Sequence, residues 1–307
     1  MKPKIFIDGE HGTTGLQIIQ RLEARSDIKL LSIAHEDRHD KQVRQSLLNE
    51  ADIVILCLPD DASREAAQMV VGGDTRLIDA STAHRTDPDW VFGFKELDPH
   101  HASRIAAAKR VSNPGCYSTG AIALIRPLTL AGVLPKDALI TINAVSGYTG
   151  GGKRLIARME DAAHEHAITA PHHIYANGLM HKHLPEITHY GMLDTPPVFT
   201  PSVGHYPQGM LVQLPLHLST IGVSREELHA CLAKHYTACP GDDVRVVSLA
   251  DGDAIDRLDA AELAGEDFMK LYVFGNGAQV NLVAQLDNLG KGASGACVQA
   301  LDLMIAG

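Results

Sequence analysis

Short apolar runs alternate with helix-like patterns through the first 80 residues, and this alternation restricts the fold more than any other feature of the chain. The run at 52–58 is so continuously apolar that both of its faces must be covered, as in a parallel sheet. Strands that alternate with helices in this way build a doubly wound α/β sheet. The expected strands are 4–8, 28–34, 52–58 and 77–80, and the expected helices are 14–25, 43–50 and 62–71.

The pattern changes after about residue 115. A helix is expected over 116–130, with Pro127 ending or kinking it because proline lacks a backbone N–H. The 307 residues are enough for two domains. We expect a Rossmann-type nucleotide domain made of residues 1–115 and 288–307, and a mixed α+β domain made of residues 116–287. The expected later strands are 139–145, 210–218, 271–274 and 279–286, and a last helix is expected at 294–305.

A glycine-rich loop joins the first expected strand to the first expected helix. Gly9, Gly12 and Gly15 stand at the spacing G-x-x-G-x-x-G, a variant of the dinucleotide-binding pattern, and Thr13 and Thr14 lie between them. Glycine lets the backbone turn tightly and approach a pyrophosphate, and the helix N-terminus offers N–H groups and a positive dipole. Its place between strand and helix favours a cofactor-binding loop over a purely structural turn.

The stretch after the second expected strand bears on the choice of cofactor. Arg38 and Lys41 suit the 2′-phosphate of NADP, whereas Glu36 or Asp37 suits the ribose hydroxyls of NAD. The pattern favours NADP(H), with NAD and solvated loop charges as the alternatives. Further cofactor contacts are expected where two strands end at the ligand-binding edge of the sheet, from Pro59 and Ser81.

Cys116 follows the turn residues Pro114 and Gly115 and precedes an apolar helix. A thiol at a helix N-terminus is activated, because the helix dipole stabilises the thiolate. The backbone N–H groups there can also stabilise an oxyanion. The sequence therefore favours Cys116 as a nucleophile. The alternative, a small buried hydrophobic residue, better suits Cys57, Cys231 and Cys297.

His181, His183 and Glu186 form the densest polar group of the sequence. In an extended strand, the first two would project to the same face. A thiol enzyme needs a base for the thiol proton and an acid for a developing alkoxide, and imidazole suits both roles. Glu186 can orient the imidazole. A metal site is the alternative, because H-x-H supplies two ligands, but no third ligand stands at a suitable spacing, so no metal is expected.

The composition excludes several classes of protein. Lys and Arg number 27 against 37 Asp and Glu, a net charge of -10, which argues against nucleic acid as a partner. No apolar run reaches the roughly 18–20 residues of a membrane span, and the N-terminus does not resemble a signal peptide. Five cysteines without a C-x-x-C pair fit a reducing compartment, so a cytoplasmic location without membrane contact is expected.

Five motifs occur in an order that resembles a known family. They are the glycine loop at 9–15, the cysteine turn at 113–117, the segment VSGYTGGGK at 145–153, the histidine segment at 181–186 and the closing segment DNLGKGASG at 287–295. Together they are similar to those of the N-acetyl-gamma-glutamyl-phosphate reductases of arginine biosynthesis, in the shorter of that family's two sequence classes. The resemblance covers essentially the whole chain.

The resemblance implies NADP(H) and the reduction of N-acetyl-L-glutamyl 5-phosphate to the semialdehyde, with inorganic phosphate released. It implies that Cys116 is the catalytic cysteine, that His183 is the acid/base group, and that His181 and Glu186 lie beside it. Asn288 matches a position near the nicotinamide. The resemblance also implies a homo-oligomer, a dimer or a tetramer, with residues 116–287 as the catalytic and dimerisation domain.

Phosphate and carboxylate groups of such a substrate need positive or N–H-rich partners. Arg85, just after a sheet strand, and Lys153, after a glycine run, are the expected candidates, and Ser146 and Gly147 can approach the substrate. The alternatives are ordinary surface charges and a simple turn of the chain. Gly290, in the closing segment, is expected to let the backbone approach the cofactor.

Other functions compatible with these residues stay open. One is a semialdehyde dehydrogenase for another acid, with aspartate semialdehyde dehydrogenase as the nearest case, although its cysteine neighbourhood differs. A second is a reductase for a carrier-bound amino acid, which the acidic charge weakens. A third is a non-enzymatic nucleotide-binding redox sensor, in which Cys116 is a sensing thiol. Substrate profiling separates the first two, and loss of turnover in Cys116→Ser separates an enzyme from a sensor.

Overall fold

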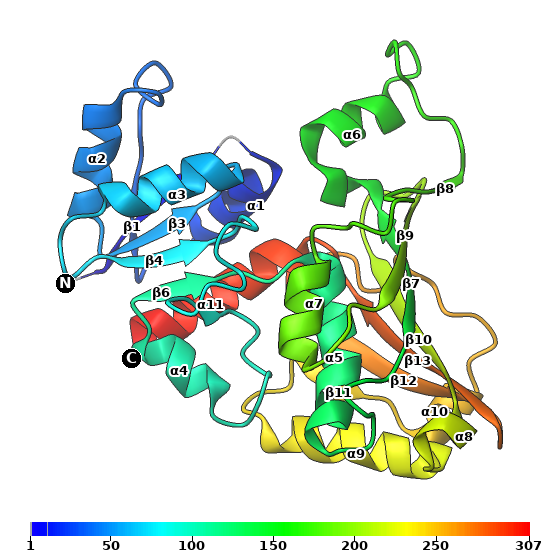
Figure 1. Ribbon diagram of the computed structural model, residues 1–307. Helices are drawn as coiled ribbons and strands as arrows, with labels where there is room; N and C mark the ends of the chain where they lie inside the picture. Colours follow the sequence, from blue (N-terminus) through cyan, green and yellow to red (C-terminus); the bar gives the residue numbers. More distant parts are fainter. Residues whose placement is uncertain (1, 11) are drawn as a thin grey trace. The chain divides into compact units, whose positions relative to one another are not determined.

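The computed structural model describes residues 2–10 and 12–307, so His11 of the glycine loop lies outside the described residues. The chain forms two compact units, each made of separate stretches of sequence (Figure 1). The first unit comprises Met1–Lys95, His101–Pro114 and Ala293–Gly307, and the second comprises Glu96–His100 and Gly115–Gly292.

A parallel sheet forms the centre of the first unit, as the alternation of strands and helices predicted. Every strand pairs with its neighbours in parallel, in the order β2-β1-β3-β4-β6-β5. The strands are short and fully buried at their centres, which explains their continuously apolar sequences. They are β1 (Lys4–Asp8), β2 (Lys29–Leu31), β3 (Ile53–Leu56), β4 (Arg76–Asp79), β5 (Val91–Phe92) and β6 (Arg110–Ser112).

Helices cover both faces of this sheet, so the first unit is doubly wound. One apolar core joins the sheet to α1, α4 and α11, and the other joins it to α2 and α3. The sequence did not predict α4, β5 or β6, because these elements are too short to show a period. The helices are α1 (Thr13–Leu22), α2 (Lys41–Glu50), α3 (Asp60–Met69), α4 (His101–Ala107) and α11 (Gly295–Ala306).

A mixed sheet forms the centre of the second unit, in the order β11-β12-β13-β10-β7-β9-β8. The β7–β9 and β11–β12 pairs are parallel and the others are antiparallel. The expected α+β character is therefore confirmed. The strands are β7 (Thr141–Gly147), β8 (His172–Ile174), β9 (Val198–Gly204), β10 (Met210–His217), β11 (Val244–Val246), β12 (Met269–Gly275) and β13 (Gln279–Leu286).

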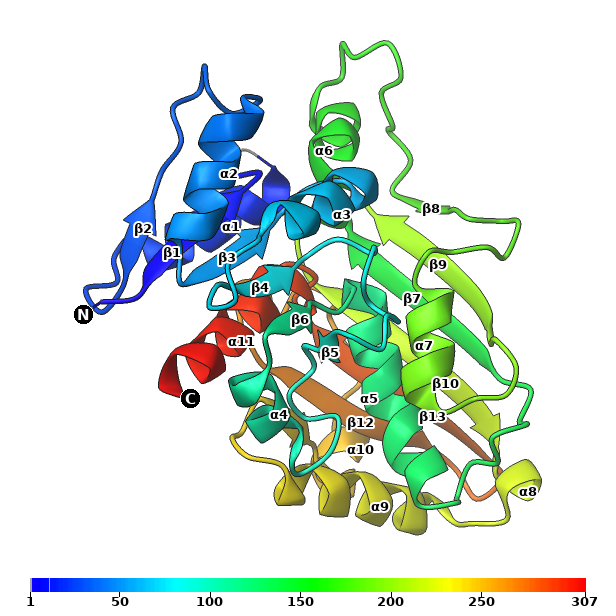
Figure 2. The same cartoon turned by 60° about the vertical axis from the view of Figure 1, so that its left-hand side comes forward.

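The central helix of the second unit is α5 (Cys116–Leu130), which is buried along most of its length. It packs on β10 and β13, and it contacts α7 and α9, which lie beside it in Figure 2. Pro127 lies inside α5 and does not end it. A residue other than proline at this position would donate its backbone N–H to the Ala123 carbonyl. Proline has no N–H, and the Tyr236 hydroxyl of α9 donates to that carbonyl instead, at 2.7 Å. The remaining helices are α6 (Gly152–Glu160), α7 (Leu184–Gly191), α8 (Leu218–Ile221), α9 (Arg225–Ala238) and α10 (Leu249–Asp253).

Two short segments lie in the second unit although the sequence placed them with the nucleotide domain. Residues 96–100 are bound to the second unit, because Arg126 Nε donates to the Leu97 carbonyl at 2.9 Å and His235 contacts the Glu96 carbonyl at 3.1 Å. Residues 288–292 stay there because the Asn288 amide bonds to Gly209 and Thr149. Over residues 2–10 and 12–307, no helix is long and apolar enough to cross a membrane.

The packing of α5 on the sheet allows a test of the fold. A Cβ at Gly120 would lie 2.8 Å from Val212 Cγ2 and 3.3 Å from Leu286 Cδ2. We expect Gly120→Val to overpack this contact and to lower the free energy of unfolding by about 1–3 kcal/mol. Urea unfolding measures the loss. The control is Gly277→Val, where a Cβ meets nothing within 4 Å; equal losses in the two variants would contradict the packing argument.

Candidate active site

Cys116 is the first residue of α5, as the turn before it predicted. Gly115 caps the helix in an extended conformation, and its carbonyl accepts from the Ser118 and Thr119 hydroxyls at 2.8 and 2.9 Å. The Gly115 N–H donates to Glu186 Oε2 at 3.3 Å. Because Glu186 stands in the first turn of α7, this bond joins the beginnings of the two helices.

His181 and His183 do not lie in a strand, the conformation in which their side chains would project to the same face. They form a turn that leads into α7, in which His183 is the residue before the helix, at φ -87° and ψ -10°. Pro185 in the first helical turn fixes a backbone angle that favours a helix start. The two rings are still brought together, with centroids 4.6 Å apart, because the His183 N–H donates to His181 Nδ1 at 3.1 Å.

Tyr175 completes this group, and sequence reasoning did not find it. Its hydroxyl lies 3.1 Å from His181 Nε2. Since Nδ1 of that ring accepts a backbone N–H, a neutral His181 carries its proton on Nε2 and donates to Tyr175. Burial raises the pKa of Tyr175, so its hydroxyl keeps its proton near neutral pH. The Tyr117 ring, next to Cys116, contacts both histidines at centroid distances of 5.7 and 6.0 Å.

The closing segment forms a buried turn at residues 287–292 that lies directly on Cys116. A Cβ at Gly292 would be 2.8 Å from Cys116 Cβ, so only glycine fits there. Asn288 accepts from the Gly209 N–H at 2.9 Å and donates to Thr149 Oγ1 at 3.0 Å. These bonds orient its amide, and its expected contact with a nicotinamide stays a prediction. A Cβ at Gly290 would lie 2.0 Å from the Glu266 carbonyl oxygen, so this glycine is also needed for packing.

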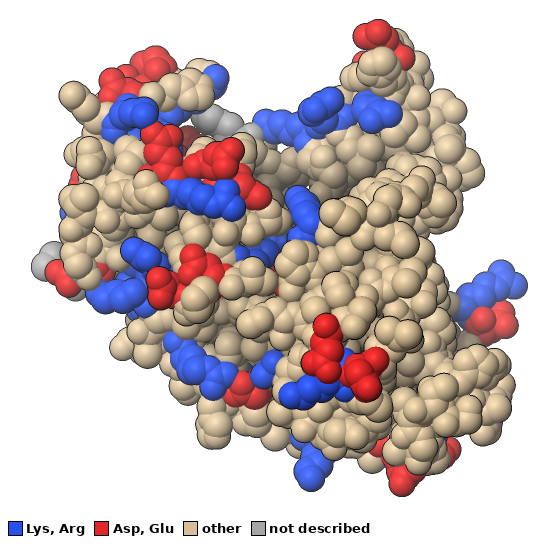
Figure 3. Space-filling model, viewed as in Figure 1, with Lys and Arg blue, Asp and Glu red and all other residues tan. Residues whose placement is uncertain are grey.

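The other predicted substrate residues of the second unit lie on β7 and α6. Ser146 and Gly147 end β7, and a Cβ at Gly147 would meet the Pro207 carbonyl at 2.4 Å. Lys153 is exposed in the first turn of α6. Figure 3 shows basic side chains gathered over this helix, which carries Lys153, Arg154 and Arg158. Nothing in these contacts joins Lys153 to the cysteine, and its binding role stays a prediction.

Two glycines of the loop in the first unit lie where a side chain would not fit. Gly9 adopts φ +91°, and a Cβ there would lie 2.4 Å from the Cys57 carbonyl oxygen. A Cβ at Gly15 would lie 2.6 Å from the Gly9 carbonyl oxygen. Gly12 precedes α1, provides no side-chain cap, and donates its own N–H to the Gly9 carbonyl at 3.0 Å. The N–H groups of the first helical turn are therefore the ones expected to meet a ligand. Among the described residues, the buried Thr13 hydroxyl has no hydrogen-bond partner.

The turn after β4 is held by the buried carboxylate of Asp79. It accepts from Ser81 N–H and Oγ at 2.9 and 2.8 Å, from Ser63 Oγ at 2.6 Å, and it contacts His84 Nδ1 at 2.6 Å. The predicted cofactor residue Ser81 therefore shapes this turn. Arg85 is also buried, and its Nε donates to the Asn113 carbonyl at 3.0 Å, which ties the turn to the segment before Cys116.

The expected cofactor residues Arg38 and Pro59 lie on two further loops of the first unit. The Arg38 guanidinium contacts the rings of His35 and His39, and these contacts restrict its conformation. Pro59 stands before α3, just beyond β3. Its carbonyl accepts from the Ser63 N–H at 2.9 Å.

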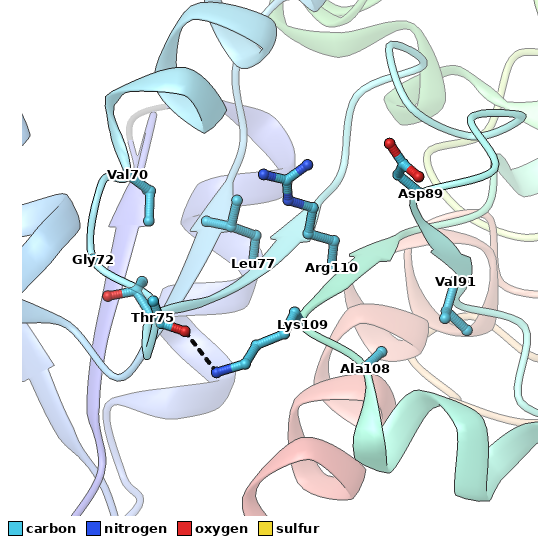
Figure 4. A pocket seen from close by; sticks show the side chains of 10 residues that line it. Val70, Gly72, Thr75, Leu77, Asp89, Val91, Ala108, Lys109 and Arg110 are labelled. Carbon is cyan, nitrogen blue, oxygen red and sulfur yellow. Dashed lines mark hydrogen bonds between the residues drawn. The ribbon is translucent and has the colours of Figure 1, made fainter.

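A separate hollow of about 420 Å³ opens on the first unit (Figure 4). It lies near the amino ends of β4 and β6, whereas Ser81 and Arg85 follow the carboxyl end of β4. Lys109 on its wall donates to the Gly73 carbonyl at 2.8 Å. None of the predicted site residues lines it. Over the described part of the chain, no three His, Cys, Asp or Glu side chains are grouped as a metal site.

The environments of the five thiols predict their reactivity. Burial raises the pKa of Cys57 and Cys231, that of Cys239 to about 11 and that of Cys297 to about 12. A thiol reacts as its thiolate, so these four stay protonated and slow at pH 8. We expect iodoacetamide to label Cys116 first, at one group per chain. Peptide mapping by mass spectrometry identifies the site, and first labelling at Cys231 would contradict the assignment.

Comparison with known proteins matches both units to one family. Residues 4–105 match the family profile described as semialdehyde dehydrogenase, NAD binding domain. Residues 116–288 match the profile described as semialdehyde dehydrogenase, dimerisation domain. The first match agrees with a nicotinamide cofactor on the parallel sheet.

Solved structures share this fold at low sequence identity. Aspartate semialdehyde dehydrogenase II from Vibrio cholerae, complexed with ASA, has a TM-score of 0.72 at 15% identity, over 100% of this chain and 99% of that one. An aspartate semialdehyde dehydrogenase with NADP from Candida albicans has a TM-score of 0.66 at 14% identity, again over 100% and 99%. At this identity the likeness shows the fold alone.

Curated relatives are far closer in sequence. The N-acetyl-gamma-glutamyl-phosphate reductase of Rhizobium etli strain CIAT 652 is 58% identical over 311 residues, covering 100% of both chains. That of Rhizobium meliloti strain 1021 is 57% identical with the same coverage. Identity at this level along the full length, together with both profile matches, assigns the chain: it belongs to the N-acetyl-gamma-glutamyl-phosphate reductase family of oxidoreductases.

Proposed function

We propose that the protein reduces N-acetyl-L-glutamyl 5-phosphate to N-acetyl-L-glutamate 5-semialdehyde with NADPH, releasing inorganic phosphate, in arginine biosynthesis. The observation that carries this proposal is the meeting of the first turns of α5 and α7, where Gly115 N–H donates to Glu186. This contact brings a nucleophile at a helix start next to two histidines. The relatives at 57–58% identity support the substrate.

Cys116 attacks the acyl carbon of the substrate as a thiolate. A sulfur–carbon bond forms, the bond from that carbon to the phosphate oxygen breaks, and phosphate leaves with its electron pair. The product of this step is a thioester on Cys116. The N–H groups at the start of α5, which Gly115 leaves without a side-chain cap, are proposed to stabilise the oxyanion that develops in this step.

The glycine loop fits a dinucleotide. Gly9 and Gly15 leave no room for side chains, and the unsatisfied Thr13 hydroxyl offers a hydrogen bond to a phosphate. When bound, NADPH supplies the two electrons that convert the thioester to the thiohemiacetal and so to the aldehyde. Arg38 is proposed to hold the 2′-phosphate. Further cofactor contacts are proposed from Pro59, Ser81, Asn288 and Gly290.

His183 moves the proton in the second half of the reaction. It protonates the oxygen of the thiohemiacetal as that oxygen gains charge, and it takes the proton back when the carbon–sulfur bond breaks and thiolate returns to Cys116. His181 holds the His183 backbone and is itself oriented by Tyr175. Glu186 acts on the cysteine turn through Gly115. It is therefore proposed as a positioning residue.

The anionic groups of the substrate need cationic partners. Arg85 on the turn after β4 and Lys153 on α6 are proposed for this role, with Ser146 and Gly147 approaching the substrate from β7. A homo-oligomer is also proposed, supported by the match of residues 116–288 to a dimerisation domain. Five cysteines as thiols, without a disulfide, support a cytoplasmic location.

The reaction can be tested in reverse. We expect N-acetyl-L-glutamate 5-semialdehyde to reduce NADP+ only when inorganic phosphate is present, because phosphate must release the acyl group from the thioester. Cys116→Ser is expected to lose turnover by about 10³-fold or more, since the alcohol is a poor nucleophile here. The matched control is Cys231→Ser, which should keep wild-type turnover. Absorbance at 340 nm follows the reaction.

Two outcomes would redirect the proposal. Turnover with aspartate semialdehyde instead would keep the thioester chemistry and reject the substrate. Binding of NADPH without turnover on either aldehyde would favour a redox sensor.

The cofactor preference gives a second test. Arg38→Gln removes the charge proposed to bind the 2′-phosphate, and an ionic hydrogen bond is worth about 1.5–3 kcal/mol. We therefore expect KM for NADP+ to rise by about tenfold or more, while KM for NAD+ changes little. The control is Arg64→Gln, an exposed residue of the same unit that pairs with Asp61 on α3. An equal rise for both cofactors would reject the assignment of Arg38.

A further inference from the structure

The second unit holds a buried ion pair close to the reacting cysteine. Lys291 Nζ lies 2.7 Å from Glu96 Oε1, and the two side chains are only 1% and 3% exposed. Removing two charges from water is costly, and an apolar pair of similar volume is often as stable or more so. A contribution to stability therefore does not explain why the two charged residues are buried here. The contacts that each of them makes with its surroundings suggest a different role.

On one side, Lys291 belongs to the turn at 287–292 that lies on Cys116. Its neighbour Gly292 is so close that an added Cβ would stand 2.8 Å from Cys116 Cβ and 3.2 Å from Cys116 Cα. The Gly292 N–H donates to the Asp287 carbonyl at 2.9 Å, which closes the turn. A displacement of Lys291 therefore moves the backbone that limits the position of the cysteine side chain.

On the other side, Glu96 belongs to a segment fastened to the helix that begins with Cys116. Arg126 of α5 donates through Nε to the carbonyl of Leu97, the residue after Glu96, at 2.9 Å. His235 of α9 contacts the Glu96 carbonyl at 3.1 Å. The glutamate thus has a fixed backbone, and its carboxylate is a fixed anchor for the lysine.

These contacts close a ring. It runs from Cys116 along α5 to Arg126, across to Leu97 and Glu96, through the ion pair to Lys291, and back through Gly292 to Cys116. Within this ring, the ion pair is the link that two charged side chains form. Its short, directed bond fixes the distance between the turn at 287–292 and α5. An apolar contact in its place would fill the space without fixing that separation.

We propose that the Lys291–Glu96 pair is a positioning device that holds Gly292 against Cys116 and so sets the orientation of the thiol for attack. This rests on the proposed function, in which Cys116 is the nucleophile. A misplacement of a reacting group by about 1 Å can cost on the order of 100-fold in rate. The pair is thus expected to act on kcat, because neither the Lys291 nor the Glu96 side chain is itself proposed to contact the substrate or the cofactor.

The test compares single and paired substitutions. Lys291→Met alone or Glu96→Gln alone leaves one buried group without its partner, and both are expected to lower Tm and activity together. In the double variant, Lys291→Met with Glu96→Leu, we expect Tm to return close to the wild-type value while kcat stays about 10- to 100-fold low. KM for phosphate should change by less than about twofold, because its proposed binding groups are untouched. KM for NADP+ is no control here, because the proposed cofactor residues Asn288 and Gly290 belong to the same turn.

The rate of Cys116 alkylation by iodoacetamide gives a readout that does not depend on the substrate. The double variant should change this rate by about threefold or more, because the turn no longer fixes the thiol. The matched control replaces a more accessible pair of the same types and length, Lys270 and Glu262 at 2.7 Å, by Met and Leu. That control should keep both the wild-type kcat and the wild-type alkylation rate.

Recovery of kcat together with Tm in the double variant would overturn the proposal and leave the pair a packing element. If the double variant does not fold, Glu96→Asp provides the test, because it keeps both charges but shortens the side chain of one partner. A lower kcat at unchanged KM supports the positioning role, and an unchanged kcat rejects it. If Cys116→Ser keeps turnover, the proposed function fails, whereas the alkylation rates still report on the positioning of the thiol.

Discussion

The burial of α5 on nearly all sides is the constraint on which the second unit depends. A helix without a polar face must be enclosed, and here the sheet covers it on one side and α7 and α9 on others. Gly120 permits the close approach to the sheet, and the Tyr236 hydroxyl satisfies the carbonyl that Pro127 leaves open. The enclosure makes α5 rigid. Cys116 therefore begins a fixed element rather than a mobile loop, as a precise catalytic geometry requires.

Elements with a strong period could be predicted from sequence. The strand at Lys4–Asp8, the helix at Cys116–Leu130 and the strand at Gln279–Leu286 have the predicted bounds, and each contains an apolar run or alternation. The strand β9 was missed, since Pro201 within it argues against a strand that pairs on both sides. No bounds were predicted for the helix α9, although the capping box of Ser224 and Glu227 marks its start.

The candidate site was predictable where chemistry shows in the local sequence. The turn residues beside Cys116 distinguish it from the buried cysteines, and the glycine spacing identifies the nucleotide loop. The spacing H-x-H did not indicate the conformation of His181 and His183, because it fits a strand as well as the turn that precedes α7. Tyr175, Gly292 and the Lys291–Glu96 pair could not be found, since their roles arise from contacts between segments distant in the chain or outside any periodic element.

The last helix of the chain has a consequence for how the protein is made. α11 contributes Cys297, Ala300, Leu301 and Met304 to the core of the first unit, and Arg76 of β4 bonds to the Met304 carbonyl. The ribosome makes these residues after the whole second unit has been synthesised. The parallel sheet therefore has one face incompletely covered until α11 has been made. Although its strands are made first, the nucleotide unit can be completed only after the unit that follows it.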